Sequence, residues 1–254
     1  MGVLRSLVIA FAMYSKIPMP KVDWKKDNMR FVLCFLPLVG ALFGLLWYLL
    51  FRLLIYIGAG ATARACLLTA LPILLSGGIH VDGYMDTMDA RNSWGSREKK
   101  LMILEDSHIG AFSVIMTIVY YLLMLASVSE VNAEYALIAA FGFAYARSLT
   151  GTAMVYMPGN KREGLAYTFT EASDKPRVRI ALLVSNVLWS ALMIVVSPYA
   201  GFAAVAAGAL WTLLFCRKME REFGGLSGDL CGCLILELEL VLAAVAAAAS
   251  LIII

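Results

Sequence analysis

Long apolar runs recur along this chain and leave few folds open to it. Such runs occupy, by residue number, 32–56, 62–79, 109–128, 135–157, 180–197, 200–216 and 232–254. A helix of about 20 apolar residues spans the hydrocarbon core of a bilayer. Only 15% of the 254 residues are charged, compared with about 25% in soluble domains. The sequence therefore predicts an all-α, polytopic membrane bundle of about seven transmembrane helices, with residues 1–254 forming a single domain.

Prolines limit two of the apolar segments. The short run after Arg5 is followed by Pro18 and Pro20, and proline cannot continue a helical hydrogen-bond ladder. We expect an interfacial or re-entrant helix at this end, with a signal peptide as the alternative reading. Pro198 separates the fifth run from the sixth, which predicts a tight helical hairpin.

Lysine and arginine are concentrated in alternate loops. Residues 1–30, 91–100, 161–179 and 217–221 together hold 18 of the 21 basic residues. Loops rich in Lys and Arg remain on the cytoplasmic side of a membrane. We therefore expect these four segments to face the cytoplasm, the lipid bilayer to be a partner, and nucleic acid not to be one.

Three aspartates follow the second apolar run at helical spacing. Asp82, Asp86 and Asp89 stand at positions i, i+4 and i+7, which places them on one face of an α-helix. Like charges so arranged repel one another unless a cation neutralises them. Mg²⁺ binds one or two carboxylates together with substrate phosphates. We predict a metal site for Mg²⁺, with Mn²⁺ as the alternative ion; a helix cap or a solvated turn is the structural alternative.

Further charged residues flank the later runs. Asp106 precedes the third run and could complete the metal site or accept a proton, although an N-cap would also explain it. Arg91 lies in a basic segment that could hold phosphates. Asp229, Glu237 and Glu239 begin or lie within the last run, where ionisable groups are rare and usually functional. Arg147, inside the fourth run, is the natural partner for one of them, and a purely structural ion pair is equally compatible with the pattern.

Two segments in the middle of the chain resemble a known signature. GGIHVDGYMDTMDA, residues 77–90, is followed by REKKLMILEDSHIGAF, residues 97–112. This pair resembles the central motif of the cobalamin synthase family, the adenosylcobinamide-GDP ribazoletransferases. KIPMP, FLPLVGALFG, KREGLA and GGLSGDLCG also follow the family pattern in order, so the resemblance extends over nearly the whole chain.

The resemblance implies a Mg²⁺-dependent phosphotransferase of vitamin B12 biosynthesis. Such an enzyme transfers the phosphocobinamide group of adenosylcobinamide-GDP to the 5′-hydroxyl of α-ribazole, or to α-ribazole 5′-phosphate, and releases GMP. It implies the cytoplasmic membrane of a prokaryote, with the active site facing the cytoplasm. A homo-oligomer, or an association with other corrinoid enzymes, stays open.

The spacing of the charged residues and the family resemblance together give the expected site residues. The expected catalytic residues are Asp106 and His80, and the expected metal ligands are Asp82, Asp86, Asp89 and Asp106. The expected substrate-binding residues are Arg91, Ser107, His108, Arg147, Arg162, Glu163, Asp229 and Glu239.

The sequence departs from the family pattern at two places. Ala90 and Arg91 follow the third aspartate where the family usually has glycine, and Leu236 replaces an expected glutamate, which leaves the role of Glu237 open.

Two other classes of protein are alternatives to this interpretation. A CDP-alcohol phosphotransferase also arrays aspartates on membrane helices, but Ala90 breaks its Asp-Gly motif. A cation transporter would place its carboxylates near the midplane, often in repeated halves, and no repeat is evident.

Overall fold

The computed structural model describes residues 2–106, 108–160 and 164–252, and this part of the chain is helical without any strand. The predicted all-α class is therefore confirmed. The helices are α1 (Gly2–Tyr14), α2 (Lys26–Met29), α3 (Val32–Tyr56), α4 (Ala61–Ser76), α5 (Ile79–Asn92), α6 (Arg97–Leu104), α7 (Ala111–Glu130), α8 (Ala136–Tyr156), α9 (Leu165–Ala172), α10 (Lys175–Val196), α11 (Pro198–Phe223) and α12 (Gly228–Ile252).

Fewer helices qualify as membrane spans than the seven apolar runs predicted. Within the described residues, α3, α7, α10, α11 and α12 are long and apolar enough to cross a membrane, and α4 with α5 qualifies only as a pair bent by 95°. The count is thus five, or six with the bent pair. Two of the runs do not qualify alone: α4 has only 16 residues and passes only together with α5, and α8 carries Arg147 and several small polar residues that lower its hydropathy. The predicted polytopic helical bundle is confirmed.

The bundle is built around α8 and α12. Both helices are largely buried, and α12 packs against α5, α7, α8 and α11. The contact between α3 and α8 depends on Gly40 and Gly44, because a Cβ at either position would overlap the carbonyl oxygen of Phe143 or Ala140. Small residues spaced by four let helix backbones approach closely in a membrane.

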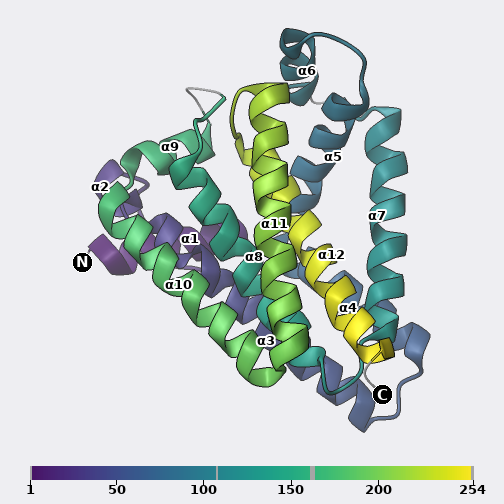
Figure 1. Cartoon of the computed structure of the whole chain (residues 1–254). Coiled ribbons are helices and arrows are strands. Elements are labelled where there is room, and N and C mark those ends of the chain that lie inside the picture. Colours follow the sequence, from purple (N-terminus) through teal and green to yellow (C-terminus); the bar gives the residue numbers. More distant parts are fainter. Residues whose placement is uncertain (1, 107, 161–163, 253–254) are drawn as a thin grey trace.

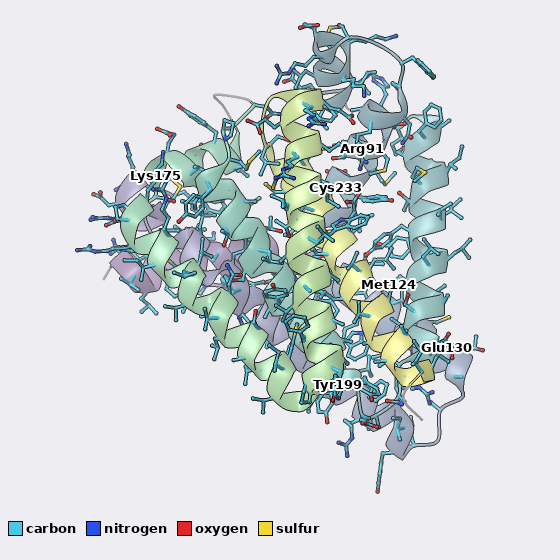
Figure 2. The ribbon with its side chains drawn as sticks, in the orientation of Figure 1. Arg91, Met124, Glu130, Lys175, Tyr199 and Cys233 are labelled. Carbon is cyan, nitrogen blue, oxygen red and sulfur yellow. The ribbon has the colours of Figure 1, made fainter. Side chains whose placement is uncertain are left out.

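The outer helices present apolar surface. On α10, the side chains of Leu183, Val184 and Val187 are each more than half exposed, as expected for a helix that faces lipid. Figure 2 shows Lys175 at the start of α10, where the chain enters the predicted hairpin, and Tyr199 at the start of α11, just after the chain reverses. The hairpin prediction is confirmed.

The ends of the bundle differ in their connections. α6 and α9 lie at one end, and the connections that follow α3, α7 and α10 lie at the other (Figure 1). The first end therefore contains basic segments that the charge pattern assigned to one side of the membrane. α1 is a shorter apolar helix of 13 residues that packs against α3.

A sharp break separates α4 from α5. Gly77 and Gly78 have φ angles of +69° and +85°, a left-handed conformation that glycine adopts without steric cost. The acidic segment is therefore a helix of its own, turned away from α4 and packed against α12 and α7. The segment after α1 is tied to this break, since the Lys16 N–H donates to the Leu75 carbonyl at 2.7 Å.

Candidate active site at three helix N-termini

A cavity of about 410 Å³ lies where α5, α8, α9 and α12 meet. Asp82 and His80 come from α5 and Asp229 from α12, and all three line it. Asp82 is exposed, whereas His80 is only 5% exposed. The predicted residues His80, Asp82 and Asp229 are therefore brought together in one cavity.

The first turns of three helices border this cavity. Ile79 begins α5, Leu165 begins α9 and Gly228 begins α12, and each residue lines it. The N-caps of α5 and α9 are glycines without a side-chain capping bond. Helix N-termini carry unsatisfied N–H groups and a partial positive charge, so they favour anions such as phosphates.

α5 and α12 pack closely where Gly83 meets Asp229. A Cβ added to Gly83 would lie 2.8 Å from both the Cα and the carbonyl oxygen of Asp229. Only a residue without a side chain fits there. Glycine at 83 therefore lets Asp82 and Asp229 face the same space from adjacent backbones.

Asp86 and Asp89 lie further along α5. Asp86 is partly buried and is not among the described residues that line the cavity. Asp89 is buried, and its two carboxylate oxygens accept the backbone N–H groups of Gly110 at 2.7 Å and Ser113 at 2.9 Å. Asp89 thus caps the start of α7, which is the structural alternative that the sequence left open.

Asp106 and His108 form a pair on the loop between α6 and α7. The His108 ring nitrogen Nδ1 lies 2.6 Å from Asp106 Oδ1, and the His108 backbone N–H donates to the same oxygen at 3.0 Å. These two hydrogen bonds lower the pKa of Asp106 below its ordinary value. Both side chains are exposed, and neither is among the described residues lining the cavity.

Arg91 has an acidic partner at the far end of α5. Its Nη1 donates to Glu237 Oε1 at 3.1 Å, and Trp211 Nε1 donates to Glu237 Oε2 at 2.9 Å. Figure 2 shows Arg91 on α5 near Cys233 of α12, whose sulfur lies 3.7 Å from Glu237 Oε1. Glu237, whose role the sequence left open, therefore links α5, α11 and α12.

Arg147 pairs with Glu239 inside the bundle, as one of the sequence alternatives predicted. Arg147 is 1% exposed, and its Nη1 donates to Glu239 Oε1 at 2.7 Å and to the Phe143 carbonyl at 3.0 Å. The pair lines a second cavity of about 40 Å³, which shares His80 with the first. That volume is far smaller than the range of about 300–1,000 Å³ typical of ligand pockets.

Three predicted substrate-binding residues, Ser107, Arg162 and Glu163, lie outside the residues that the structure describes. Tyr14 of α1 and Thr150 of α8 are among the cavity residues that sequence reasoning missed. The Tyr14 ring stacks on His80, with centroids 6.1 Å apart. Tyr14 lies only two residues before the quoted KIPMP segment, and this proximity was the available signal; Thr150 looks like any polar residue of a buried helix.

The donor set suits a hard cation only in part. Within the described ranges, no three His, Cys, Asp or Glu side chains form a group that could hold a metal ion. Asp82 and Asp229 nevertheless line one cavity, and two carboxylates with phosphate oxygens are the ligands that Mg²⁺ typically takes in phosphate-binding enzymes. The residues present therefore fit Mg²⁺ together with a phosphorylated substrate.

Comparisons with known proteins identify the family of this chain. The family model described as cobalamin-5-phosphate synthase matches residues 6–247. An adenosylcobinamide-GDP ribazoletransferase of Lachnoclostridium phytofermentans is 40% identical over 237 residues, covering 93% of this chain and 91% of the relative. An enzyme of the same name from Desulfitobacterium hafniense is 34% identical, covering 90% of this chain and 91% of the relative. No solved structure matches the chain. The chain belongs to the cobalamin-5-phosphate synthase family, as its motifs predicted.

Proposed function

We propose that this protein is an adenosylcobinamide-GDP ribazoletransferase, which joins the phosphocobinamide group to α-ribazole or its 5′-phosphate and releases GMP. One observation carries the proposal: in a chain of this family, Asp82 and Asp229 line a single cavity bordered by the first turns of three helices. A CDP-alcohol phosphotransferase and a cation transporter, the two other classes considered, are not what the family match supports.

The cavity combines the two elements that a diphosphate substrate requires. Helix N-termini attract the phosphate oxygens, whereas Asp82 and Asp229 would repel them in the absence of a cation. Mg²⁺, or Mn²⁺ in its place, would be held by Asp82 and Asp229, with Asp86 one turn away on α5. When bound, it would neutralise charge on the phosphates and on the departing GMP. Asp89 is not included, because its oxygens cap α7.

The acceptor hydroxyl loses a proton as it bonds to the phosphorus attached to the corrinoid, and the bond from that phosphorus to GMP breaks. His80 lines the cavity and its Nε2 has no hydrogen-bond partner among the described residues, so it is the better placed of the two expected bases to take this proton. Asp106 pairs instead with His108 on the exposed loop.

The identity of the attacking hydroxyl follows from the product. The family is named for a cobalamin 5-phosphate, so the 5′-oxygen of α-ribazole 5′-phosphate keeps its phosphate during transfer. The 5′-hydroxyl that we expected as the nucleophile is blocked in that acceptor. We therefore assign the attack to a secondary hydroxyl of the ribose, which both acceptors carry.

Location follows from the same proposal. Multiple apolar helices make this a multi-pass membrane protein. The cavity is bordered by α9, at the same end of the bundle as the basic α6 (Figure 1), so we place the reaction at the cytoplasmic face of a prokaryotic cytoplasmic membrane.

The test is reconstitution of the purified protein in lipid vesicles with adenosylcobinamide-GDP, α-ribazole and Mg²⁺, followed by mass analysis of the corrinoid product. We expect one product and one GMP per transfer, and none after chelation of the metal. Asp82→Asn should abolish turnover without unfolding the protein. Asp23→Asn is the matched control, because the Asp23 carboxylate is exposed and pairs with the equally exposed Lys25. Turnover of CDP-diacylglycerol, with none of the corrinoid, would overturn the assignment.

A further inference from the structure

The active-site cavity changes in character from its mouth to its inner end. Asp82 and Leu165 are exposed at the mouth. Leu36, Thr150 and Ile235 line the same cavity and are 1%, 0% and 2% exposed. The cavity therefore leads from charged, open surface into an apolar interior that contains a hydroxyl group.

The hydroxyl of Thr150 has no hydrogen-bond partner among the described residues. Five other helical threonines donate to the carbonyl four residues before them: Thr87, Thr152, Thr168, Thr170 and Thr212. Thr150 does not form this local bond although it is fully buried. A buried hydroxyl without a partner is costly, so a ligand atom that pairs with it would be favoured.

We propose that the inner end of this cavity binds the base of the acceptor nucleoside, α-ribazole, and that Thr150 donates to its free ring nitrogen. This inference rests on the proposed function. The dimethylbenzimidazole base is flat and apolar except for one unsubstituted nitrogen, which accepts a hydrogen bond. Leu36 and Ile235 provide the apolar surroundings, and Thr150 provides the single donor.

Guanine, the base of the donor substrate, fits this end poorly. It carries an amino group, a ring N–H and a carbonyl, all of which need partners when buried. Asp82 and Asp229, which could accept from such groups, are not at the buried end: Asp82 is exposed and Asp229 is partly so. Burial of guanine beside Thr150 would leave polar atoms unpaired.

The volume of the cavity points the same way. About 410 Å³ is within the range of pockets that enclose small molecules. A nucleoside is of that size, whereas the corrin ring with its side chains is several times larger. The corrinoid must therefore remain at the mouth, beyond Asp82 and Asp229, while the nucleoside enters.

An aromatic wall completes the base site. Tyr14 lines the cavity, and its ring lies between His80, at 6.1 Å, and Phe169, at 6.4 Å between centroids. Because these two rings pack against it, we expect Tyr14 to shape the wall of the base site rather than to stack on the base. α1 would thus contribute to the site through Tyr14.

The test compares three threonine variants in steady-state kinetics and in direct binding of α-ribazole without the corrinoid donor. Thr150→Val removes the hydroxyl at constant shape and should raise the KM and Kd for α-ribazole about five- to tenfold, with the KM for adenosylcobinamide-GDP unchanged. Thr150→Ser keeps the hydroxyl and should restore binding. Thr69→Val is the matched control, because the Thr69 hydroxyl is also buried and unpartnered but lines the second, small cavity.

The outcomes separate this inference from the proposed function. If wild-type protein makes cobalamin product but Thr150→Val leaves the α-ribazole constants unchanged, the base site is wrong and the function stands. If Thr150→Val raises only the KM for adenosylcobinamide-GDP, the inner end binds guanosine instead. If wild-type protein makes no product, the function itself fails. A thermal unfolding curve for each variant excludes misfolding as the cause.

Discussion

Neutralising Glu239 should destabilise the protein more than removing its partner Arg147. The two side chains are 6% and 1% exposed, with 2.7 Å between Arg147 Nη1 and Glu239 Oε1. In Glu239→Gln, the guanidinium stays charged and loses its counter-ion. In Arg147→Met, the remaining carboxyl can take up a proton and become neutral. Loss of one partner of a buried pair costs about 3–5 kcal/mol, so we expect Glu239→Gln in this range and Arg147→Met below it.

Reversible unfolding in detergent micelles, analysed as a double-mutant cycle, measures these differences. The Arg147→Met/Glu239→Gln variant should be more stable than Glu239→Gln alone, because it contains no unpaired charge. Arg30→Met is the control: Arg30 pairs with Asp174 at 2.6 Å but is 49% exposed, so its loss should cost about 0–1 kcal/mol.

Two results would refute the reasoning. A Glu239→Gln variant within about 1 kcal/mol of wild type would show that the pair stabilises little. A folded double variant whose KM for either substrate rises about tenfold would assign Arg147 and Glu239 to substrate binding, the role that the family resemblance implied for them. Unchanged KM values would leave the pair a structural element of the bundle.

Three further predictions concern Gly83, Asp89 and Asp106. Gly83→Ala should lower turnover at least about tenfold, because the added methyl group forces α5 away from α12. Gly60→Ala is the control and should not lower turnover, since a Cβ at that position meets nothing within 4 Å. Equal product formation by the two variants would contradict the role of close packing. Asp89→Ala should lower the unfolding free energy by about 1–2 kcal/mol through loss of the α7 cap, without changing the Mg²⁺ concentration for half-maximal activity, and a large change in that concentration would make Asp89 a metal ligand. Hydrogen bonds hold the pKa of Asp106 low. The Asp106 carboxylate therefore stabilises the fold fully above the ordinary aspartate pKa of about 3.9, and this stabilisation is lost as the pH falls through the lower pKa that Asp106 has in the folded protein. The stability difference between wild type and Asp106→Asn should therefore shrink as the pH falls below about 3.9, and a difference that stays the same down to the acid limit of folding would contradict this.

The helices were predictable because a long apolar run in a membrane has only one way to satisfy its backbone hydrogen bonds. This constraint gave all seven long helical regions, including the hairpin at Pro198. It did not give the number of spans, because whether a helix crosses the membrane or lies inside the bundle depends on its neighbours. α8 is the clear case: its Arg147 is tolerated because Glu239 faces it from α12.

The site was predictable where its residues are close in sequence. His80 and Asp82 share one motif and share the cavity. The helical spacing of the three aspartates predicted the site only in part, because packing directs the Asp89 carboxylate to the start of α7. Tyr14 and Thr150 come from helices far from the motif, and only tertiary packing brings them to His80. No spacing in the sequence encodes that proximity.

The shortness of α4 suggests a chemical reason for the membrane location. Sixteen residues extend about 24 Å, less than the roughly 30 Å of the hydrocarbon layer. If α4 starts at one boundary of that layer, the chain turns at Gly77 before it reaches the other boundary, and we expect the cavity that begins at Ile79 to be a recess below the lipid head groups. An activated diphosphate held there would encounter less bulk water than at the surface, so transfer to a sugar would be favoured over hydrolysis. The ratio of GMP released to corrinoid product formed measures this protection, and a ratio well above one would argue against it.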